Sequence, residues 1–190
     1  MKPLILASGS PRRAKILRDL GIDFEIVKTD ADETAIPDDP VRTVTTNALA
    51  KLHAAENAVD APSRSILAAD TIVWFAGRIY GKPRDLDEAK EFLRGLSGQT
   101  HSVFTGVAFR AEDGTERTAC AESRVTFRAL TEESIAEYVA RVRPTDRAGA
   151  YDIDESGDLI VASYTGSYEN IMGLPVEPIR TFGIGVCNAV

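Results

Sequence analysis

Residues 8 to 13, SGSPRR, combine side-chain types that can bind a phosphate group. The apolar run from Leu4 to Ala7 predicts a buried strand before them, and Ser10 followed by Pro11 is typical of a helix start. A helix N-terminus attracts anions through its unpaired N–H groups and its dipole. Arg12 and Arg13 in the first turn oppose that dipole, which favours a bound anion. The alternative is a capped helix with two solvated arginines.

Carboxylates at two places could serve a metal ion or a reacting water. Asp32 and Glu33 lie in an acidic loop, where two carboxylates can hold Mg²⁺ or can simply be solvated. Asp70 precedes Thr71 inside the apolar run ILAADTIVWF. A carboxylate in such a run must be paired, bind a metal, or lie at a strand end facing a cleft.

Two lysines are further candidates for phosphate contacts. Lys82 follows a glycine in GKP, which is not a Walker A motif, and Lys51 lies on an expected helix. A solvated surface position is the alternative for each lysine. We expect His101 to have a core or capping role, because no Ser or Cys nucleophile stands at a suggestive spacing. The absence of a GxSxG motif argues against an α/β-hydrolase.

The elements that must position these residues alternate between strand and helix in the first half of the chain, and a hairpin follows. This order predicts an α/β fold with a mixed sheet flanked by helices. Helices are expected to begin at Pro11, Pro40, Asp85 and Thr131. Strands are expected at Leu4–Ala7, Phe24–Lys28, Ile66–Phe75, Val103–Phe109, Arg117–Phe127 and Leu159–Tyr164.

Length and composition narrow the class of protein. A chain of 190 residues with 44% hydrophobic residues fits one domain or two small lobes sharing a core. The net charge of −7 disfavours nucleic acid polymers and anionic membranes as partners. Cys120 and Cys187 form no metal or disulfide pattern, and neither a signal peptide nor a membrane span is evident. We therefore expect a cytoplasmic protein.

The candidate segments, in their order along the chain, resemble the Maf family of nucleotide pyrophosphatases. Each segment is a weak signal alone, but the ordered set is specific and spans nearly the whole chain. The matching segments are LASGSPRR from Leu6, DE at Asp32, NALAK from Asn47, AADT from Ala68, GKP from Gly81, FLRGLSGQTHSVFTGV from Phe92, DRAGAY from Asp146 and GSYENIMGLPVE from Gly166.

The resemblance implies one Maf-like domain over residues 1–190, with two lobes around a cleft. It also implies hydrolysis of a nucleoside triphosphate between its α and β phosphates, with a divalent cation such as Mg²⁺ or Mn²⁺. The family often forms dimers, so a homodimer is one state that the resemblance allows. By the same resemblance, Asp70 is the catalytic carboxylate, Glu33 and Asp70 are metal ligands, and the residues expected to bind substrate include Ser8, Arg12, Arg13, Lys51 and Lys82.

The SPRR and DT forms resemble the family branch that prefers dTTP and UTP, which makes Thr71 a selectivity position. This chain departs from that branch at residues 150–155, where AYDIDE replaces AYGIQG. Asp154 therefore stands in place of a Gln that is expected to help select the base. Gln donates and accepts hydrogen bonds, whereas ionised Asp can only accept, so base preference is an open question.

Two other functions remain open on the sequence. One is a regulatory protein that binds nucleotides and affects septum formation, the effect that gave the family its name. The other is a phosphatase that removes the terminal phosphate. The carboxylates beside the expected triphosphate site favour catalysis over binding alone, and product analysis would separate the two hydrolytic reactions.

Overall fold

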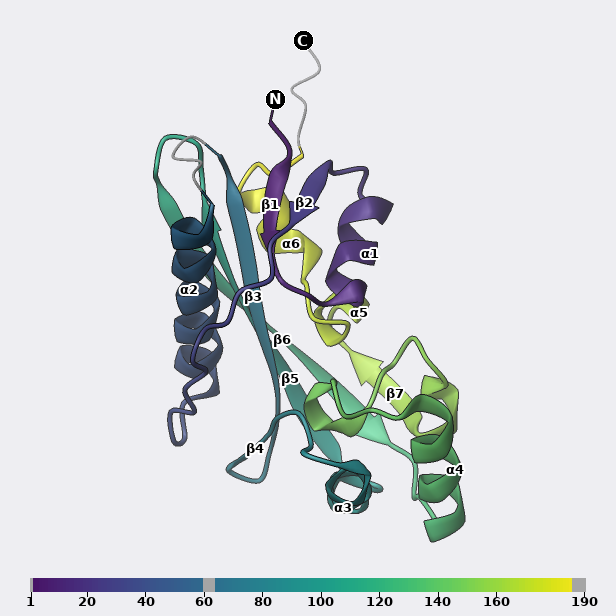
Figure 1. Ribbon diagram of the computed structural model, residues 1–190. Coiled ribbons are helices and arrows are strands. Elements are labelled where there is room, and N and C mark those ends of the chain that lie inside the picture. The colour runs from purple at the N-terminus through teal and green to yellow at the C-terminus, as the bar shows by residue number, and fades with distance from the viewer. Residues whose placement is uncertain (1, 60–63, 186–190) are drawn as a thin grey trace. The chain divides into compact units, whose positions relative to one another are not determined.

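The computed structural model describes residues 2–59 and 64–185, and Cys187 lies outside them (Figure 1). The chain divides into two compact units. Unit 1 comprises Met1–Asp70, Thr105–Ala121 and Gly173–Val190, and unit 2 comprises Thr71–Phe104 and Glu122–Met172. The cleft between lobes and the single domain over residues 1–190 stay predictions.

Within the described residues, seven strands form a mixed sheet in the order β2-β1-β3-β5-β6-β7, with β4 paired to β3. β1 runs parallel to both β2 and β3, whereas the β3–β4 and β6–β7 pairs are antiparallel. The predicted α/β class and mixed sheet are therefore confirmed. The strands are β1 (Leu4–Ala7), β2 (Phe24–Ile26), β3 (Ile66–Phe75), β4 (Arg78–Tyr80), β5 (Thr100–Arg110), β6 (Glu116–Phe127) and β7 (Val161–Thr165).

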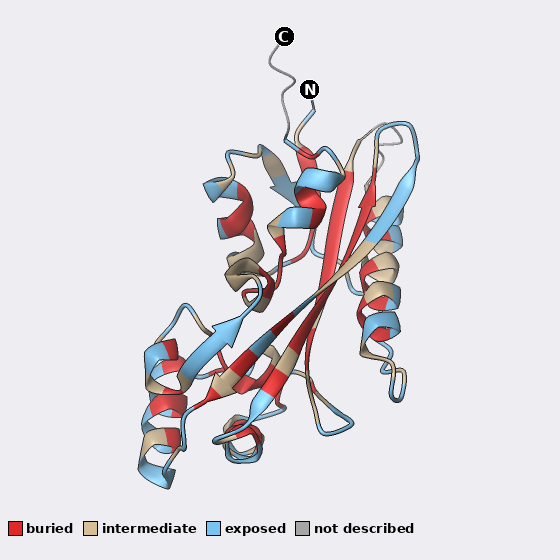
Figure 2. Ribbon diagram, turned by 180° about the vertical axis from the view of Figure 1, so that it is seen from behind, coloured by how far each residue is buried: buried red, intermediate tan, exposed pale blue. Residues whose placement is uncertain are grey.

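Unit 1 covers both faces of its parallel strands with helices, and β1 is buried along its whole length (Figure 2). In Figure 1, α2 (Pro40–Ala58) lies on one side of β1 and β3, and α1 (Pro11–Asp19) and α6 (Val176–Thr181) lie on the other. Strands covered on both faces read as continuous apolar runs, which explains the unbroken patterns LILA and ILAA. The core between α2 and the strands is formed by Ile5, Ala7, Ala48, Leu52, Ala55, Ile66, Ala68 and Ala108.

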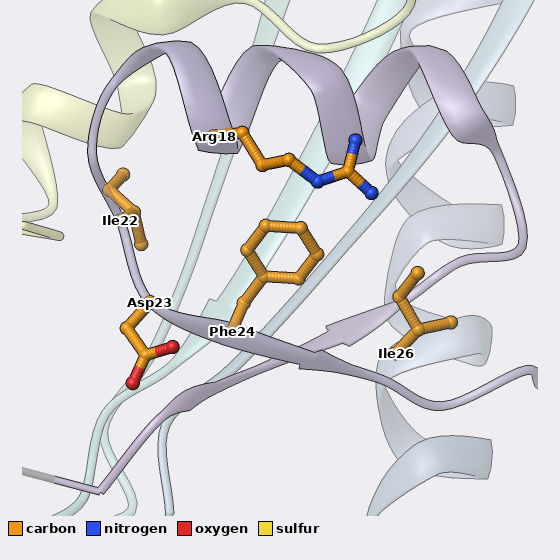
Figure 3. A pocket seen from close by; sticks show the side chains of 5 residues that line it. All are labelled: Arg18, Ile22, Asp23, Phe24 and Ile26. Carbon is orange, nitrogen blue, oxygen red and sulfur yellow. The ribbon is translucent and has the colours of Figure 1, made fainter.

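The edge of unit 1 at β2 carries a pocket beside α1 (Figure 3). Arg18 of α1 lies over the ring of Phe24, with its guanidinium carbon 5.8 Å from the ring centroid. Ile22, Asp23 and Ile26 complete the lining. None of the residues predicted to do chemistry lines this pocket.

Unit 2 is built around the packing of α3 (Leu86–Leu96) and α4 (Glu132–Val142) against β-strands. His101 is buried there, and its Nε2 lies 3.0 Å from the hydroxyl of Tyr151. Burial lowers the pKa of His101 to about 4, so the ring is neutral at physiological pH. The predicted core role of this histidine is confirmed.

Helix starts agree with the sequence because their causes are local. The side chains of Ser10, Asp39, Asp85 and Thr131 each accept a hydrogen bond from the first turn of the helix they cap. Glu88, three residues after the N-cap Asp85, accepts a hydrogen bond from the backbone N–H of Arg84 rather than from that of Asp85. The short elements β4, α5 (Tyr168–Ile171) and α6 were not anticipated.

Gly106 of β5 marks the closest approach of α2 to the sheet. A Cβ built on this residue would overlap the backbone carbonyl of Val44 in α2 and would lie 2.7 Å from the backbone nitrogen of Thr45. Both obstacles are backbone atoms, which cannot move aside as the tip of a flexible side chain can. Glycine is therefore required here for space.

We expect Gly106→Ala to lower the free energy of unfolding by about 1–3 kcal/mol, because the added methyl must push α2 away from β5. Gly81→Ala is the matched control, since Gly81 has no positive φ and its Cβ would meet no atom within 4 Å. Urea unfolding followed by circular dichroism measures both variants. Equal stability of the two would contradict the close approach.

Candidate active site

The turn between β1 and α1 is closed by its own side chains. Ser8 is buried, and its Oγ accepts hydrogen bonds from the backbone N–H of Ser10 at 3.2 Å and from the guanidinium of Arg13 at 3.0 Å. Ser10 in turn caps α1 by accepting from the backbone N–H of Arg13. Arg12 lies in the first turn and is partly exposed. Two arginines therefore lie at the positive end of α1, as the sequence predicted.

Arg13 points inward and ties distant parts of unit 1 together. Its Nε donates to the backbone carbonyl of Gly173 at 2.7 Å, 160 residues along the chain. Burial lowers the pKa of Arg13 to about 10, against the raising effect of Asp70, and nearby Arg12 lowers it further. The group stays cationic at neutral pH. Because the charges of Asp70 and Glu33 both raise the pKa of Arg13, the three groups belong to one electrostatic neighbourhood.

Asp70 lies inside β3, at the level where β1 ends. The parallel register pairs Ala7 with Ala68, so Ser8 and Asp70 both follow the last paired residues of this ladder. The carboxylate is buried and each of its oxygens has a partner: Oδ1 accepts from Lys51 at 2.6 Å, and Oδ2 accepts from the side-chain amide of Asn47 at 3.0 Å. Of the sequence-based options, pairing is confirmed. The option of a strand end is wrong, because β3 continues to Phe75.

Lys51 joins two carboxylates that come from different elements. Its Nζ lies 2.6 Å from Asp70 and 2.8 Å from Glu33, which belongs to the loop before α2. Lys51 is largely buried, whereas Glu33 is about half exposed and so open to solvent or a ligand. Two carboxylate oxygens that converge on one cation are a donor set suited to Mg²⁺ or Mn²⁺, so these residues fit a divalent ion.

Asn47 is a site residue that the sequence reasoning did not select. Besides holding Asp70, its amide donates to the carbonyl of Thr34 at 3.1 Å, and its side-chain oxygen accepts from the N–H of Thr34 at 2.8 Å. It therefore fastens the loop that carries Glu33 to α2. The signal was present, because Asn47 and Lys51 are four residues apart and share one face of the helix.

The other predicted site residues belong to unit 2. Thr71 follows Asp70 in β3 and is partly buried, and Lys82 is exposed just after β4. Asp154 is exposed, and its carboxylate accepts a hydrogen bond from the hydroxyl of Tyr168 at 3.1 Å. Burial, aided by this contact, raises the pKa of Tyr168 to about 12. Substrate contacts of these three residues stay predictions.

The unusual AYDIDE segment satisfies its extra carboxylates locally. Arg147 pairs with Asp152 at 3.0 Å, with Glu155 at 2.7 Å and with the neighbouring Asp146 at 2.8 Å. Two of the three added carboxylates are therefore paired with one guanidinium, whose single positive charge they share with Asp146. The third, Asp154, interacts with a neutral hydroxyl and keeps its negative charge uncompensated by that contact.

A second group could offer metal ligands elsewhere in unit 1. One ligand atom from each of His53, Glu56 and Glu116 lies within 4.8 Å of the others. These side chains already form ion pairs, however: His53 with Glu116 at 3.0 Å, and Glu56 with Arg110. Arg110 competes with a metal ion for Glu56, just as Lys51 does for Glu33 and Asp70, so ion pairing does not rank one group above the other as a cation site.

Comparison with known proteins identifies the family. The profile described as Maf-like protein matches residues 3–182. The chain belongs to the Maf family. A protein named dTTP/UTP pyrophosphatase from Bacillus cereus is 45% identical, with 100% of this chain and 94% of that protein aligned. A protein of the same name from Bacillus anthracis is 44% identical over the full length of both.

Among solved structures, the chain is similar to the Staphylococcus aureus Ham1 protein, with a TM-score of 0.48 and 14% identity over 66% of this chain and 72% of that one. A nucleoside-triphosphatase (dITP/XTP pyrophosphatase) from Mycobacterium abscessus gives a TM-score of 0.42 and 16% identity over 68% and 76%. No helix in the described part of the chain is both long and apolar enough to cross a bilayer. The cytoplasmic location stays a prediction.

We expect Asn47→Ala to lower the free energy of unfolding by about 1–3 kcal/mol, because it removes partners of Asp70 and Thr34 from a buried site. Asn57→Ala is the matched control, since Asn57 is exposed on the same helix. Chemical denaturation of both variants measures the difference. If Asn47→Ala were as stable as the control, Asn47 would not be holding the loop and the carboxylate.

Proposed function

We propose that this protein is a nucleoside triphosphate pyrophosphatase that hydrolyses dTTP and UTP to the nucleoside monophosphate and pyrophosphate. The observation that carries the proposal is the buried carboxylate of Asp70, held by Lys51 and Asn47 in the electrostatic neighbourhood of Arg13. The names of the Bacillus relatives, which align over the whole of this chain, support the same activity.

The residues at the start of α1 suit a polyphosphate chain. The positive end of the α1 dipole, together with the guanidinium groups of Arg12 and Arg13, offers positive potential where phosphate oxygens would bind. Ser8 orients Arg13 by accepting its hydrogen bond, so this cation is held in place before substrate arrives. Lys82 is assigned by the family resemblance as a further phosphate contact.

Asp70 is assigned as the general base for the attacking water, as a metal ligand, or as both. Lys51 and Asn47 each occupy one lone pair, so each carboxylate oxygen keeps capacity to accept another hydrogen bond. A water that donates to Asp70 would form the new bond from its oxygen to the α-phosphorus. The bond from that phosphorus to the bridging oxygen breaks, pyrophosphate leaves, and the proton of the water passes to Asp70.

Glu33 and Asp70 would hold Mg²⁺ or Mn²⁺, which when bound would neutralise phosphate charge and polarise the reacting phosphoryl group. Lys51 lies between these two carboxylates and keeps them close together without an ion. Its ammonium can then swing toward a phosphate oxygen, because a lysine head group is a flexible point charge.

We expect the purified protein, incubated with dTTP or UTP and Mg²⁺ or Mn²⁺, to release pyrophosphate and a monophosphate. Asp70→Asn keeps the shape of the side chain but removes its charge, and should lower kcat by about 10²–10⁴-fold or more. Ion-exchange chromatography of the products measures both. Asp19→Asn on the surface of α1 makes the same chemical change and should retain wild-type kcat.

Each assay result has a distinct meaning. Orthophosphate and a nucleoside diphosphate as products would replace the proposed reaction by removal of the terminal phosphate. Tight nucleotide binding without turnover would support the regulatory alternative. Near-normal turnover by a folded Asp70→Asn protein would exclude the assignment of Asp70.

Base selection is assigned to Thr71 and Asp154 within the same proposal. Ionised Asp154 accepts hydrogen bonds but donates none, and the donor from Tyr168 occupies one of its lone pairs. The remaining lone pairs suit a base that presents an amino group, such as cytosine. The carbonyl oxygens of thymine and uracil would instead face another acceptor. We therefore propose a preference for dTTP and UTP that is broadened toward CTP.

We expect Asp154→Gln to raise the ratio of kcat/KM for dTTP to that for CTP by about tenfold, since an unmatched polar contact costs about 1–3 kcal/mol. Glu155→Gln is the matched control, because it makes the same change one residue away on a side chain that pairs with Arg147. Steady-state kinetics with both nucleotides measures the ratio. An unchanged ratio in Asp154→Gln would mean that Asp154 does not contact the base.

A further inference from the structure

Lys28 lies against the turn that precedes α1, although α1 and β2 separate the two in the sequence. The residue follows β2 by two positions, and its alkyl chain crosses Gly9, the middle residue of the turn Ser8-Gly9-Ser10. Its Cγ and Cε lie 3.6 Å, and its Cδ 3.7 Å, from the point where a Cβ of residue 9 would stand. The ammonium, one bond beyond Cε, therefore lies at the edge of this turn.

The surroundings of the Lys28 ammonium differ from those of two other cations of the site, Arg13 and Lys51. Arg13 donates to Ser8 and Gly173, and Lys51 is shared by Glu33 and Asp70. Lys28 is exposed, and within residues 2–59 and 64–185 no carboxylate forms an ion pair with it. Its positive charge is therefore available to an incoming anion, in a chain whose net charge of −7 would otherwise repel one.

Contact with Gly9 also restricts where the ammonium can go. A lysine loses rotamer entropy when its head group is fixed, and an alkyl chain already packed along a surface has lost part of that freedom beforehand. Gly9 has no positive φ, so a glycine here is not demanded by the backbone. Because Gly9 has no side chain, the alkyl chain of Lys28 can lie against the turn at this residue.

We propose that Lys28 is a further substrate-binding residue, whose ammonium contacts the polyphosphate chain of the nucleotide and the pyrophosphate product at the turn before α1. This inference rests on the proposed function, which supplies the triphosphate. Lys28 binds the anion without taking part in bond breaking, so it affects substrate and product binding more than the chemical step.

The test compares Lys28→Gln and Lys28→Arg with Lys2→Gln. Lys2 is also exposed, but it precedes β1 and so lies at the opposite end of that strand from the turn. Calorimetric titration with inorganic pyrophosphate gives Kd, and steady-state kinetics with dTTP gives KM and kcat. We expect Lys28→Gln to raise Kd and KM about fivefold at low salt with little change in kcat. Lys28→Arg should restore both constants, and Lys2→Gln should match the wild type.

Salt provides a readout that a structural role would not move. The difference between Lys28→Gln and wild type should shrink in high salt, because the Debye length falls to about 3 Å at 1 M. Equal Kd and KM in Lys28→Gln and Lys2→Gln at low salt would overturn the role of Lys28 while wild-type hydrolysis upheld the proposed function. Pyrophosphate binding that depends on Lys28, without hydrolysis of any nucleotide, would refute the proposed function and leave an anion site.

Discussion

Asp70 is 4% exposed, and an ionised carboxylate at such a depth must be compensated by charge and hydrogen bonds. The compensation comes from one turn of α2, through Lys51 on one oxygen and Asn47 on the other. The same two residues hold the acidic loop, Lys51 through Glu33 and Asn47 through Thr34. One buried charged group therefore links α2, β3 and the acidic loop through a single set of contacts.

The start of α1 shows how an apparent conflict in the sequence is resolved. Arginines in a first turn oppose the helix dipole, which suggested a ligand rather than a stable helix end. In the structure, Arg13 turns inward to Ser8 and to Gly173, in the GLP segment near the C-terminus. Part of the unfavourable electrostatics is thus offset by folding contacts. A phosphate group would add to that compensation, so the conflict has both a structural and a functional component.

Features with local causes were predictable from the sequence, and features with long-range causes were not. Caps at Ser10, Asp39 and Thr131 follow from contacts within three residues, so their helices begin where expected. Strand ends depend on partners elsewhere in the sheet, and β2 ends two residues before the predicted Lys28. The candidate residues of the first 70 positions were identified by type, but the role of Asn47 depends on a contact across 23 residues with Asp70.

The substitutions in AYDIDE also have effects that the sequence alone does not predict. Sequence comparison identifies Asp154 as a changed selectivity position. It does not reveal that Arg147 forms ion pairs with Asp152 and Glu155, or that the Tyr168 hydroxyl donates to Asp154. The charged residues of this segment share partners, so the effect of changing one of them depends on the others.

Alanines make up more than half of the core between α2 and the sheet, where Ala48 and Ala55 belong to one cluster with Ala7, Ala68 and Ala108. Together with Gly106, whose Cβ position lies against the backbone of Val44, these small side chains let α2 lie close to the sheet, and the reach of Lys51 to Asp70 depends on that distance. Drift of these alanines toward larger residues over evolutionary time would thicken that layer and stretch the contact to Asp70. Such changes would therefore lower the stability of the fold and weaken the support of Asp70 together, because one layer serves both.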